Sequence, residues 1–493
     1  MVNILISGYY GFDNIGDESI LRTLVSSLRE HIPDCSLTVL SHNPTSTREK
    51  YGVEAVDRMS PMAILRAVKK CDMLISGGGS LLQDVTSSKS LHYYLSIIRC
   101  AEFFHKKVFI YSQGIGPIDR PGNRRAAAAA LKRADGIVVR DERSAALLEE
   151  IGIARDKVVI TADPVIRMKK PDGDVGAEIL RKAGVSLDGR LTVGWAIRER
   201  DTDSRFVKEL LRSIQMMKDK YNAQSVLIPF HYEEDGEVCR HIAAQLPDDT
   251  AVCLNEKYLS EDMLSIIGNM DLLVGVRLHS LIYAAIMGVP LIGISYDPKC
   301  TAFLNSVGLD KLSTKENFTA ELFLPEAERV LETGKEQVQC VEAHMAKLSR
   351  KLDTNEKMIC AIMEKSRKHT MQDPQNNTEK KDKSGVRTAG AISFVFLLTL
   401  FAKLLGVVRE MMQANIFGTG IDADLYTASY NSTLYLFTTM CYALCIAAVP
   451  ILTKEFAADR KRGEKAANNL LTITLLGSLA AVVLWKIFAS TPL

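Results

Sequence analysis

The amino-acid sequence predicts an α/β protein with two Rossmann-like lobes, followed by a linker and about three transmembrane α-helices. Up to about residue 365, short apolar runs alternate with amphipathic segments, which is typical of parallel strands joined by helices. The series starts again near residue 190, so two consecutive sheets are expected. Long apolar stretches follow towards the C-terminus, and each is long enough to cross a bilayer as a helix.

The first lobe is expected over residues 1–168. Its strands are predicted where apolar residues follow one another, because a strand that is buried on both faces is apolar throughout. These runs are VNILISG (2–8), SLTVLS (36–41), MLISG (73–77), KVFIYSQ (107–113), GIVVR (136–140) and KVVIT (157–161). Apolar residues at helical spacing between them predict helices at 17–31, 61–70 and 143–151.

The second lobe is expected over residues 175–365, after a hinge in the polar segment MKKPDG (168–173). Its predicted strands are LTVGWAI (191–197), SVLIPF (225–230), LLVGVR (272–277) and LIGIS (291–295). Ligands of open parallel sheets bind outside the carboxyl ends of the strands. We therefore expect the functional residues to line a cleft between the two lobes.

The C-terminal region differs in composition from both lobes. Residues 366–386 are polar and rich in Asn, Gln and Lys, which predicts a flexible linker. Residues 387–493 then contain three apolar stretches, at 389–408, 425–452 and 470–489. Buried core helices are the alternative, but three such stretches in succession after a linker favour a membrane segment.

Basic residues predict the orientation of this membrane segment. They precede the first span and separate the second from the third: Lys380, Lys381, Lys383 and Arg387, then Lys454, Arg460, Lys461, Arg462 and Lys465. The connection between the first two spans is not basic, with Arg409 against Glu410, Asp422 and Asp424. Because cytoplasmic loops carry the excess of Lys and Arg, the two lobes are placed at the cytoplasmic face of the membrane. The N-terminus has no basic n-region or cleavage site, so no signal peptide is expected.

The composition excludes several classes of protein. Hydrophobic residues make up 47% and charged residues 24%, so a sizeable core is expected and global disorder is not. The net charge of +2 does not favour a nucleic-acid partner. The 10 cysteines form no CxxC pair and no cluster with histidine at zinc-ligand spacing. A reducing compartment and no metal site are therefore expected.

The first predicted strand runs into the glycine-rich segment GYYGFDNIGDESIL (8–21). Gly8, Gly11 and Gly16 allow a tight turn and close approach to a ligand. Free N–H groups at the start of the next helix favour an anion or a polar sugar. A simple turn with Asp17 as helix N-cap is the alternative. The spacing fits neither a GxGxxG nor a Walker motif, so neither a nicotinamide cofactor nor ATP is predicted.

Two further loops with glycine follow predicted strands of the same lobe. They are SGGGSLLQD (76–84) and SQGIGP (112–117). The carboxyl ends of parallel strands meet at one edge of a sheet, so the three loops lie together. Together the three loops predict a ligand-binding rim along this edge of the sheet.

Charged residues follow the strands of the second lobe. They are Arg198 and Arg200 in GWAIRER (194–200), His231 in PFHYEED (229–235), and Arg277 and His279 in GVRLHSLIYAAIMGVP (275–290). Arginine binds carboxylate or phosphate with two parallel hydrogen bonds, and histidine donates protons near neutral pH. A single such residue is most often a surface or capping residue. Arg277 and His279 favour function because they are two apart at a strand end, and continued strand alternation would put both on one side.

Together GYYGFDNIGDESIL, SGGGSLLQD, SQGIGP and GVRLHSLIYAAIMGVPLIGISYDPK resemble the polysaccharide pyruvyltransferase family, in particular its CsaB-like bacterial members, over about residues 1–350. The resemblance implies a GT-B-like fold with the acceptor on the first lobe and the donor on the second. It implies phosphoenolpyruvate as co-substrate, no other cofactor, and a lipid-linked saccharide, commonly containing N-acetylmannosamine, as acceptor. The product would be a pyruvate ketal on a secondary cell-wall polymer, which in that family helps to anchor surface-layer proteins.

This chemistry requires an acid for the methylene carbon of the donor, cations for its carboxylate and phosphate, and a base for the sugar hydroxyls. His279 is the predicted acid, with His231 as its rival on the donor side. Arg277 and Arg198 are the predicted donor-binding cations, and Asp17 or Glu18 is the predicted base. Acceptor contacts are predicted at Gly11, Asn14, Gly16, Gly78, Gly79 and Gln113.

The segment KLLGVVREMMQANIFGTGIDADLYTA (403–428) is similar to the start of lipid II flippases of the MurJ/MviN family. The matching positions are Gly406, Arg409, Glu410, Phe417, Gly418 and Asp424. That family has about fourteen helices, and three cannot enclose its cavity, because polar groups in a membrane must be shielded by neighbouring helices. Flipping by this chain alone is therefore not expected. A gene fusion, a truncated gene or a membrane anchor would each account for the tail.

Two other functions fit parts of the pattern. A nucleotide-sugar glycosyltransferase or epimerase has the same broad fold, and it would bind a nucleotide diphosphate sugar in place of phosphoenolpyruvate. A fragment of a lipid II flippase with a regulatory soluble part is the other alternative, and its activity would reside in residues 386–493.

Overall fold

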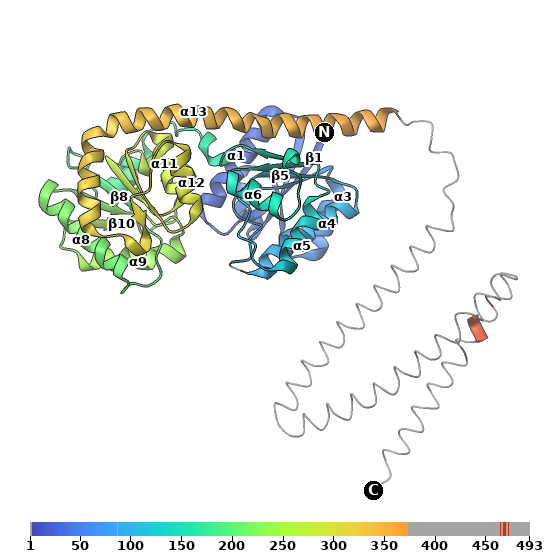
Figure 1. Ribbon diagram of the computed structural model, residues 1–493, viewed down its shortest axis with the longest axis horizontal. Helices are drawn as coiled ribbons and strands as arrows, with labels where there is room; N and C mark the ends of the chain where they lie inside the picture. Colours follow the sequence, from blue (N-terminus) through green and yellow to red (C-terminus); the bar gives the residue numbers. More distant parts are fainter. Residues whose placement is uncertain (1, 86, 373–463, 465–466, 470–471, 473–493) are drawn as a thin grey trace, which may run out of the picture. The chain divides into compact units, whose positions relative to one another are not determined.

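The computed structural model describes residues 2–85 and 87–372, together with Glu464, residues 467–469 and Thr472 (Figure 1). The chain divides into two compact units, Met1–Pro374 and Gln375–Leu493, and the first contains both lobes. The predicted membrane stretches lie almost entirely outside the described residues, and the flippase-like segment lies wholly outside them. Within the described ranges, no helix is both long enough and apolar enough to cross a membrane.

The first lobe is built on a seven-stranded parallel sheet with the order β3-β2-β1-β4-β5-β6-β7. Its strands are β1 (Val2–Tyr10), β2 (Cys35–Ser41), β3 (Glu54–Asp57), β4 (Met73–Ser76), β5 (Lys107–Gln113), β6 (Gly136–Val139) and β7 (Val158–Ile160). Six of them coincide with predicted strands. Strand β3 is missing from the sequence prediction, because EAVD is short and half of it is acidic.

Most helices of this lobe begin after a residue whose side chain caps them. They are α1 (Ile15–His31), α2 (Pro44–Tyr51), α3 (Pro61–Lys70), α4 (Ser88–Phe103), α5 (Pro121–Leu131) and α6 (Glu142–Glu150), with short 3-10 helices η1 (Arg155–Lys157) and η2 (Pro164–Arg167). The side chains of Asn14, Ser60 and Asp141 accept hydrogen bonds from backbone N–H groups of the following turn. Helix α1 therefore has Asn14 as its N-cap, and Asp17 lies in its first turn.

The second lobe has a six-stranded parallel sheet with the order β10-β9-β8-β11-β12-β13. Its strands are β8 (Thr192–Ala196), β9 (Gln224–Leu227), β10 (Ala251–Cys253), β11 (Leu272–Gly275), β12 (Leu291–Ser295) and β13 (Ser313–Thr314). Its helices are α7 (Val175–Lys182), α8 (Arg205–Tyr221), α9 (Tyr232–Gln245), α10 (Ser260–Ile267), α11 (Leu278–Met287), α12 (Pro298–Ser306) and α13 (Ala320–Gln372), with the short η3 (Lys315–Asn317). The two Rossmann-like lobes predicted from the sequence are confirmed.

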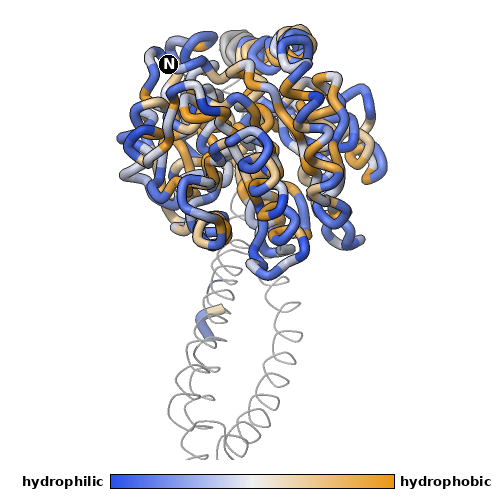
Figure 2. Tube along the Cα trace, turned by 90° about the vertical axis from the view of Figure 1, so that its left-hand side faces the viewer, coloured by the Kyte–Doolittle hydropathy of each residue, from blue (hydrophilic) through white to orange (hydrophobic). Residues whose placement is uncertain are grey.

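The two lobes share a hydrophobic cluster. Ile15 and Ile20 of α1 and Val165 of η2 pack with Leu281 and Tyr283 of α11. Burying side chains of this size stabilises the fold by roughly 1.5–3 kcal/mol each. Figure 2 shows hydrophobic residues mainly inside the lobes and hydrophilic residues mainly along their outer loops. The shared cluster keeps the carboxyl edges of the two sheets close to each other.

Helix α13 runs over both lobes (Figure 1). It is kinked at Thr333 (φ −103°, ψ 16°), whose hydroxyl donates to the Arg329 carbonyl at 2.8 Å. After the kink the helix returns to the first lobe, where Glu356 accepts hydrogen bonds from Ser27 (2.6 Å) and Tyr111 (3.1 Å). The end of the segment 175–365 thus packs on the first lobe, and the helix continues into the predicted linker.

Candidate active site

The two lobes meet at the start of helix α1. Asn14 and His231 form an isolated antiparallel β-bridge between the lobes. Gly16 lies against the His279 imidazole, and a Cβ at this position would overlap the ring. The glycine-rich loop and His279 are therefore neighbours, and glycine at position 16 permits their close approach.

His279 lies in the first turn of α11, with 18% of its side chain exposed. Its Nε2 atom is buried and has no hydrogen-bond partner within the described part of the chain. The nearest carboxylate oxygen recorded for it is Oδ2 of Asp163, at 3.8 Å. Burial lowers the pKa of His279 to about 4, although the Asp163 charge acts in the opposite direction. The imidazole is therefore neutral at physiological pH and has an unused polar atom.

Arg140 follows strand β6 and forms an ion pair with the same carboxylate, that of Asp163. It donates to Asp163 Oδ2 at 3.0 Å and to the Ser80 hydroxyl at 2.9 Å, and its side chain is only 6% exposed. Gly114 leaves room for the guanidinium, because a Cβ there would lie 2.5 Å from it. Since Arg140 pairs with Asp163, the negative charge of that residue does not hold a proton on His279.

Lys299 adds a second cation from the other lobe. It lies in the first turn of α12, and its Nζ atom is 3.4 Å from the Asp297 carboxylate. Its charge lowers the pKa values of both Asp17 and His279, so it lies within electrostatic reach of these residues. We refer to Arg140, Asp163, His279, Lys299 and Asp17 as the charged cluster.

Asp17 completes the charged cluster from the first lobe. It is partly exposed, and Gly79 lies beside it, close enough that a Cβ added to this glycine would be 3.0 Å from Asp17 Oδ1. Burial and then the neighbouring Glu18 raise the pKa of Asp17 to about 7, while Lys299 and Arg140 act against the rise. A carboxyl group with this pKa can gain or lose a proton near neutral pH.

Arg277 lies two residues before His279 but has a different partner. Its guanidinium makes a two-pronged ion pair with Asp235 of α9, a residue that is 1% exposed, and Glu234 lies 3.7 Å away. Burial opposes the charge of Arg277, whereas Asp235 raises its pKa. The role of Arg277 in donor binding stays a prediction, because its hydrogen-bonding groups are directed at Asp235 in this structure.

Arg198 and His231 occupy the ends of β8 and β9. The Arg198 guanidinium stacks on the Tyr296 ring, 4.4 Å from its centroid, and it makes no hydrogen bond or ion pair within the described ranges. It is therefore able to bind an anion. His231 caps α9, with its Nδ1 atom accepting from the Glu234 N–H at 3.3 Å, so one of its two ring nitrogens is already used.

Comparisons with known proteins bear on the family and the fold of this chain. The family model for polysaccharide pyruvyl transferase matches residues 14–298, more than half of the chain, and includes every member of the charged cluster except Lys299. The chain belongs to the polysaccharide pyruvyl transferase family. It is 21% identical over 370 residues to the amylovoran biosynthesis protein AmsJ of Erwinia amylovora, covering 64% of this chain and 88% of that one.

Solved structures show the same fold as this transferase at low sequence identity. HepE of Anabaena, in complex with UDP-glucose, gives a TM-score of 0.52 at 11% identity and covers 74% of this chain and 100% of its own. A glycosyltransferase of Rickettsia africae gives 0.51 at 12% identity, covering 73% and 98%. The GT-B-like arrangement implied by the sequence is confirmed.

Glu18 and Asn14 hold the glycine-rich loop of the transferase in place. The Glu18 carboxylate accepts hydrogen bonds from the Gly11 N–H at 2.8 Å and from the Tyr51 hydroxyl. The Asn14 side chain accepts from the Gly16 N–H at 3.1 Å. Burial raises the pKa of Glu18, but both of its oxygens already have partners. Of the two predicted bases, Asp17 is the one whose carboxylate is available.

The predicted acceptor-binding residues beyond this loop differ in accessibility. Gly79, at φ +89°, forms a bridge with Gln113, and a Cβ on Gly78 would lie 2.9 Å from Ile20. The Gln113 side chain is fully buried and donates to Ser76 Oγ at 2.7 Å and to the Gly77 carbonyl at 2.6 Å. A fully buried side chain cannot touch a saccharide in this structure, so Gln113 shapes the rim from below.

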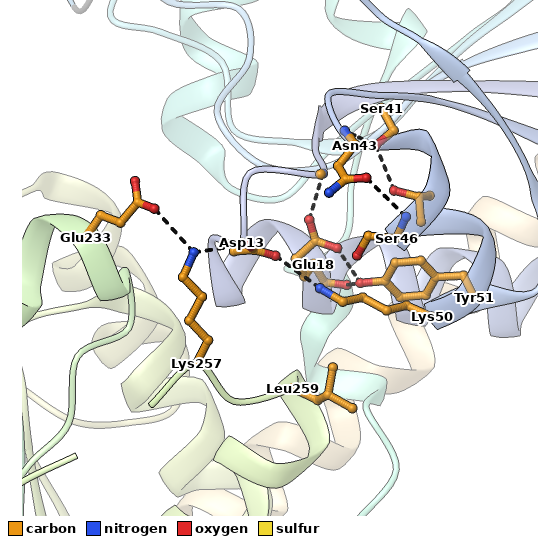
Figure 3. Close-up of polar contacts among 12 residues, drawn as sticks. Asp13, Glu18, Ser41, Asn43, Ser46, Lys50, Tyr51, Glu233, Lys257 and Leu259 are labelled. Atoms are coloured by element: carbon orange, nitrogen blue, oxygen red, sulfur yellow. Dashed lines mark hydrogen bonds and ion pairs between the residues drawn. The ribbon is translucent and has the colours of Figure 1, made fainter. Parts of the chain in front are cut away.

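A separate pocket of about 240 Å³ lies between the lobes on the other face of α1. Figure 3 shows Asp13 between Lys50 and Lys257, with ion-pair distances of 3.0 and 3.5 Å, and Lys257 also pairs with Glu233 at 3.2 Å. Ile15, Glu18 and Arg22 line this Asp13 pocket, at helical spacing along one face of α1. Gly16, Asp17 and Ile20 lie on the opposite face.

Arg140, Asp163 and Lys299 are not among the residues predicted from the sequence. All three follow strands at the carboxyl edge of a sheet, in GIVVR (136–140), after KVVIT (157–161) and in YDPK (296–299). The rule that directed attention to Arg198 and Arg277 applies to them as well. It would have found Arg140 had it been applied to the first lobe.

Proposed function

We propose that this transferase moves the pyruvyl group of phosphoenolpyruvate onto two hydroxyls of a saccharide and forms a pyruvate ketal. The observation that supports it most strongly is the charged cluster. Arg140 and Lys299, from opposite lobes, act electrostatically on one buried histidine whose Nε2 atom has no partner within the described part of the chain. Two cations beside a neutral imidazole suit a ligand that carries both a carboxylate and a phosphate.

Arg140, Lys299 and Arg198 together bind the carboxylate and the phosphate of the donor. Arg140 is held rigidly by Asp163 and Ser80, so it offers the remaining part of its guanidinium in a fixed position. Lys299 is paired only with Asp297 at 3.4 Å among the described residues, and Arg198 is stacked on Tyr296 without an ion pair in the same ranges. Arg277 supports the site indirectly, through Asp235, unless that pair opens when the donor binds.

His279 acts as the acid once the donor is bound. Its pKa of about 4 leaves it neutral in the free protein, and Arg140 and Lys299 contribute to this depression. A bound phosphate and carboxylate neutralise these cations and place negative charge beside the ring, so the pKa rises and His279 takes up a proton. It then gives this proton to the methylene carbon of phosphoenolpyruvate, which leaves an oxocarbenium-like centre at the carbon that bears the phosphate.

Asp17 acts as the base for the acceptor. The first sugar hydroxyl forms a bond to the oxocarbenium carbon and releases its proton to the Asp17 carboxylate. The carbon–oxygen bond to phosphate then breaks, and the second hydroxyl takes its place and also loses a proton. One of these two protons replaces the one given to the methylene carbon, and the other leaves with inorganic phosphate. The pKa of about 7 for Asp17 suits a group that accepts and passes on a proton.

We propose that the acceptor is a lipid-linked cell-wall saccharide and that the catalytic lobes lie at the cytoplasmic face of the membrane. The apolar composition of residues 387–493 and the basic residues around the spans support this placement. The resemblance of residues 403–428 to lipid II flippases points to envelope assembly as well. A secondary cell-wall polymer that anchors surface-layer proteins is the acceptor that the family resemblance favours.

The full-length protein provides the test. It is incubated with phosphoenolpyruvate and a lipid-linked disaccharide that contains N-acetylmannosamine, and released phosphate and the ketal carbon are followed by NMR. We expect both products in equal amounts. Phosphate without a ketal would contradict the acceptor assignment. Thermal stabilisation by UDP-sugars but not by phosphoenolpyruvate would favour a nucleotide-sugar transferase instead.

A further inference from the structure

Three aromatic rings form a parallel stack at the carboxyl edge of the first sheet. Tyr9 and Phe12 have ring centroids 4.1 Å apart with an interplanar angle of 6°, and Phe12 and His42 are 4.4 Å apart at 5°. Tyr9 is at the end of β1, Phe12 in the loop that follows, and His42 directly after β2. Tyr9 and Phe12 are half-buried and His42 is exposed. We refer to these three residues as the aromatic stack.

The aromatic stack is held from one side by Arg58. The guanidinium lies 5.8 Å from the Tyr9 centroid and 5.1 Å from that of Phe12. It donates to the Gly8 carbonyl at 3.0 Å and to the Tyr94 hydroxyl at 3.2 Å, and the residue is 7% exposed. Because Arg58 is buried and bonded on both sides, the rings are fixed before any ligand arrives.

Tyr9, at one end of the aromatic stack, is influenced by charges of the charged cluster and of the second lobe. The pKa of the Tyr9 phenol is raised by burial and then by Asp17, and Glu234 of the second lobe contributes as well. Tyr9 therefore lies within electrostatic reach of the proposed base and of the opposite lobe. Gly11 (φ +79°) and Asp13 (φ 55°) turn the intervening loop so that Phe12 enters between Tyr9 and His42.

We propose that Tyr9, Phe12 and His42 form an acceptor subsite, and that the apolar face of a sugar ring of the acceptor stacks on its exposed end, at His42. This inference rests on the proposed function. A pyranose ring presents C–H groups on its faces, and these pack against aromatic faces by dispersion. A nucleobase would also stack on these rings, so the binding measurement below compares UDP with the sugar. Arg58, the cation behind the rings, is buried and donates to Gly8 and Tyr94.

His42→Ala is the cleanest variant, because His42 is exposed and its removal leaves Tyr9 and Phe12 packed on Arg58. We expect the KM for the disaccharide acceptor to rise roughly tenfold, with the KM for phosphoenolpyruvate and kcat at saturating acceptor within about twofold of the wild type. His42→Tyr should restore the acceptor KM. Phe103→Ala is the matched control, since Phe103 is an exposed aromatic residue of the same lobe, in α4.

A binding measurement separates this inference from the proposed reaction. Saturation-transfer NMR with a soluble N-acetylmannosamine-containing disaccharide reports contact between aromatic protons and sugar C–H protons, whether or not a ketal forms. We expect transfer to the sugar ring in the wild type and in Phe103→Ala, and its loss in His42→Ala. An unchanged acceptor KM together with unchanged transfer in His42→Ala would overturn the subsite. So would transfer to the base of UDP in place of the sugar. Failure of the wild type to form a ketal, with transfer intact, would overturn only the proposed function.

Discussion

Asp13 and Asp17 lie four residues apart around the start of α1, yet the pKa values of their carboxyl groups are shifted in opposite directions. Lys50 and Lys257 hold the pKa of Asp13 below its usual range, although burial acts in the other direction. Burial and Glu18 raise the pKa of Asp17 to about 7. The two residues face opposite sides of the helix start, one towards the Asp13 pocket and the other towards the charged cluster.

The difference separates an interface that joins the lobes from the one at which we propose that the reaction takes place. Each carboxylate–lysine contact around Asp13 is an ion pair within 3.5 Å, and these side chains are partly exposed to water. In the charged cluster, the buried Nε2 atom of His279 has no hydrogen-bond partner in the described ranges, and the pKa values of His279 and Asp17 are displaced in opposite directions. Unpaired buried groups with displaced pKa values are typical of functional sites.

The largest expected effect is on catalysis. His279→Gln keeps the size and polarity of the side chain but cannot transfer a proton, so kcat for ketal formation should fall roughly 10²- to 10⁴-fold. Single-turnover phosphate release measures this directly. His241→Gln, a histidine of α9 outside the charged cluster, is the control and should retain activity. A loss of less than tenfold in His279→Gln would assign the acid to another residue, with His231 next in order.

The buried pair beside the charged cluster should dominate stability. Asp235→Ala leaves the Arg277 guanidinium buried without its carboxylate, and the free energy of unfolding should fall by about 3–5 kcal/mol. Urea denaturation measures this loss. Adding Arg277→Met should recover part of it, because no uncompensated charge then remains. If the double variant is as unstable as the single one, the pair does more than satisfy its own charges.

The pH dependence of stability tests Asp17. Its pKa is raised in the folded state, so between about pH 4 and pH 7 the unfolded chain loses this proton first and stability falls as the pH rises. At pH 8 the free energy of unfolding of Asp17→Asn should therefore be about 1–3 kcal/mol higher than that of the wild type. This range is reduced because Asp17 is partly exposed to water. The difference should shrink as the pH is lowered towards 4. A variant that is less stable than the wild type at pH 8 would contradict the raised pKa.

The smallest effect is expected in the Asp13 pocket. Lys257→Ala removes ion pairs with Asp13 and Glu233 that are open to solvent, so the unfolding free energy should change by less than about 1 kcal/mol. Turnover should stay within about threefold of the wild type, since the charged cluster is on the other face of α1. A loss of turnover as large as that of His279→Gln would remove the distinction between the two faces.

The sequence predicts the sheets of this protein better than its site. Uninterrupted apolar runs identify ten of the described strands, because strands buried on both faces need such runs. The three that the sequence does not identify, β3, β10 and β13, are short strands at the edges of the sheets. Strands β3 and β13 contain polar residues, and β10 has only three residues. His279 and Asp17 are predicted from the sequence because each lies at the start of a helix that follows a strand. The sequence does not show that Arg277 and Glu18 have other partners, because the partner of each side chain is decided only when the chain folds. Arg277 pairs with Asp235, and Glu18 accepts hydrogen bonds from Gly11 and Tyr51.

Binding of phosphoenolpyruvate, measured by calorimetry on the full-length protein, tests the central claim most directly. We predict that Arg140→Ala and Lys299→Ala weaken binding roughly 10-fold to 100-fold each, because each removes a charged hydrogen-bonding group from the donor. Lys50→Ala and Lys257→Ala, on the opposite face of α1, should bind as the wild type does. Normal binding in the first pair of variants and weakened binding in the second would contradict the assignment of the charged cluster as the donor site.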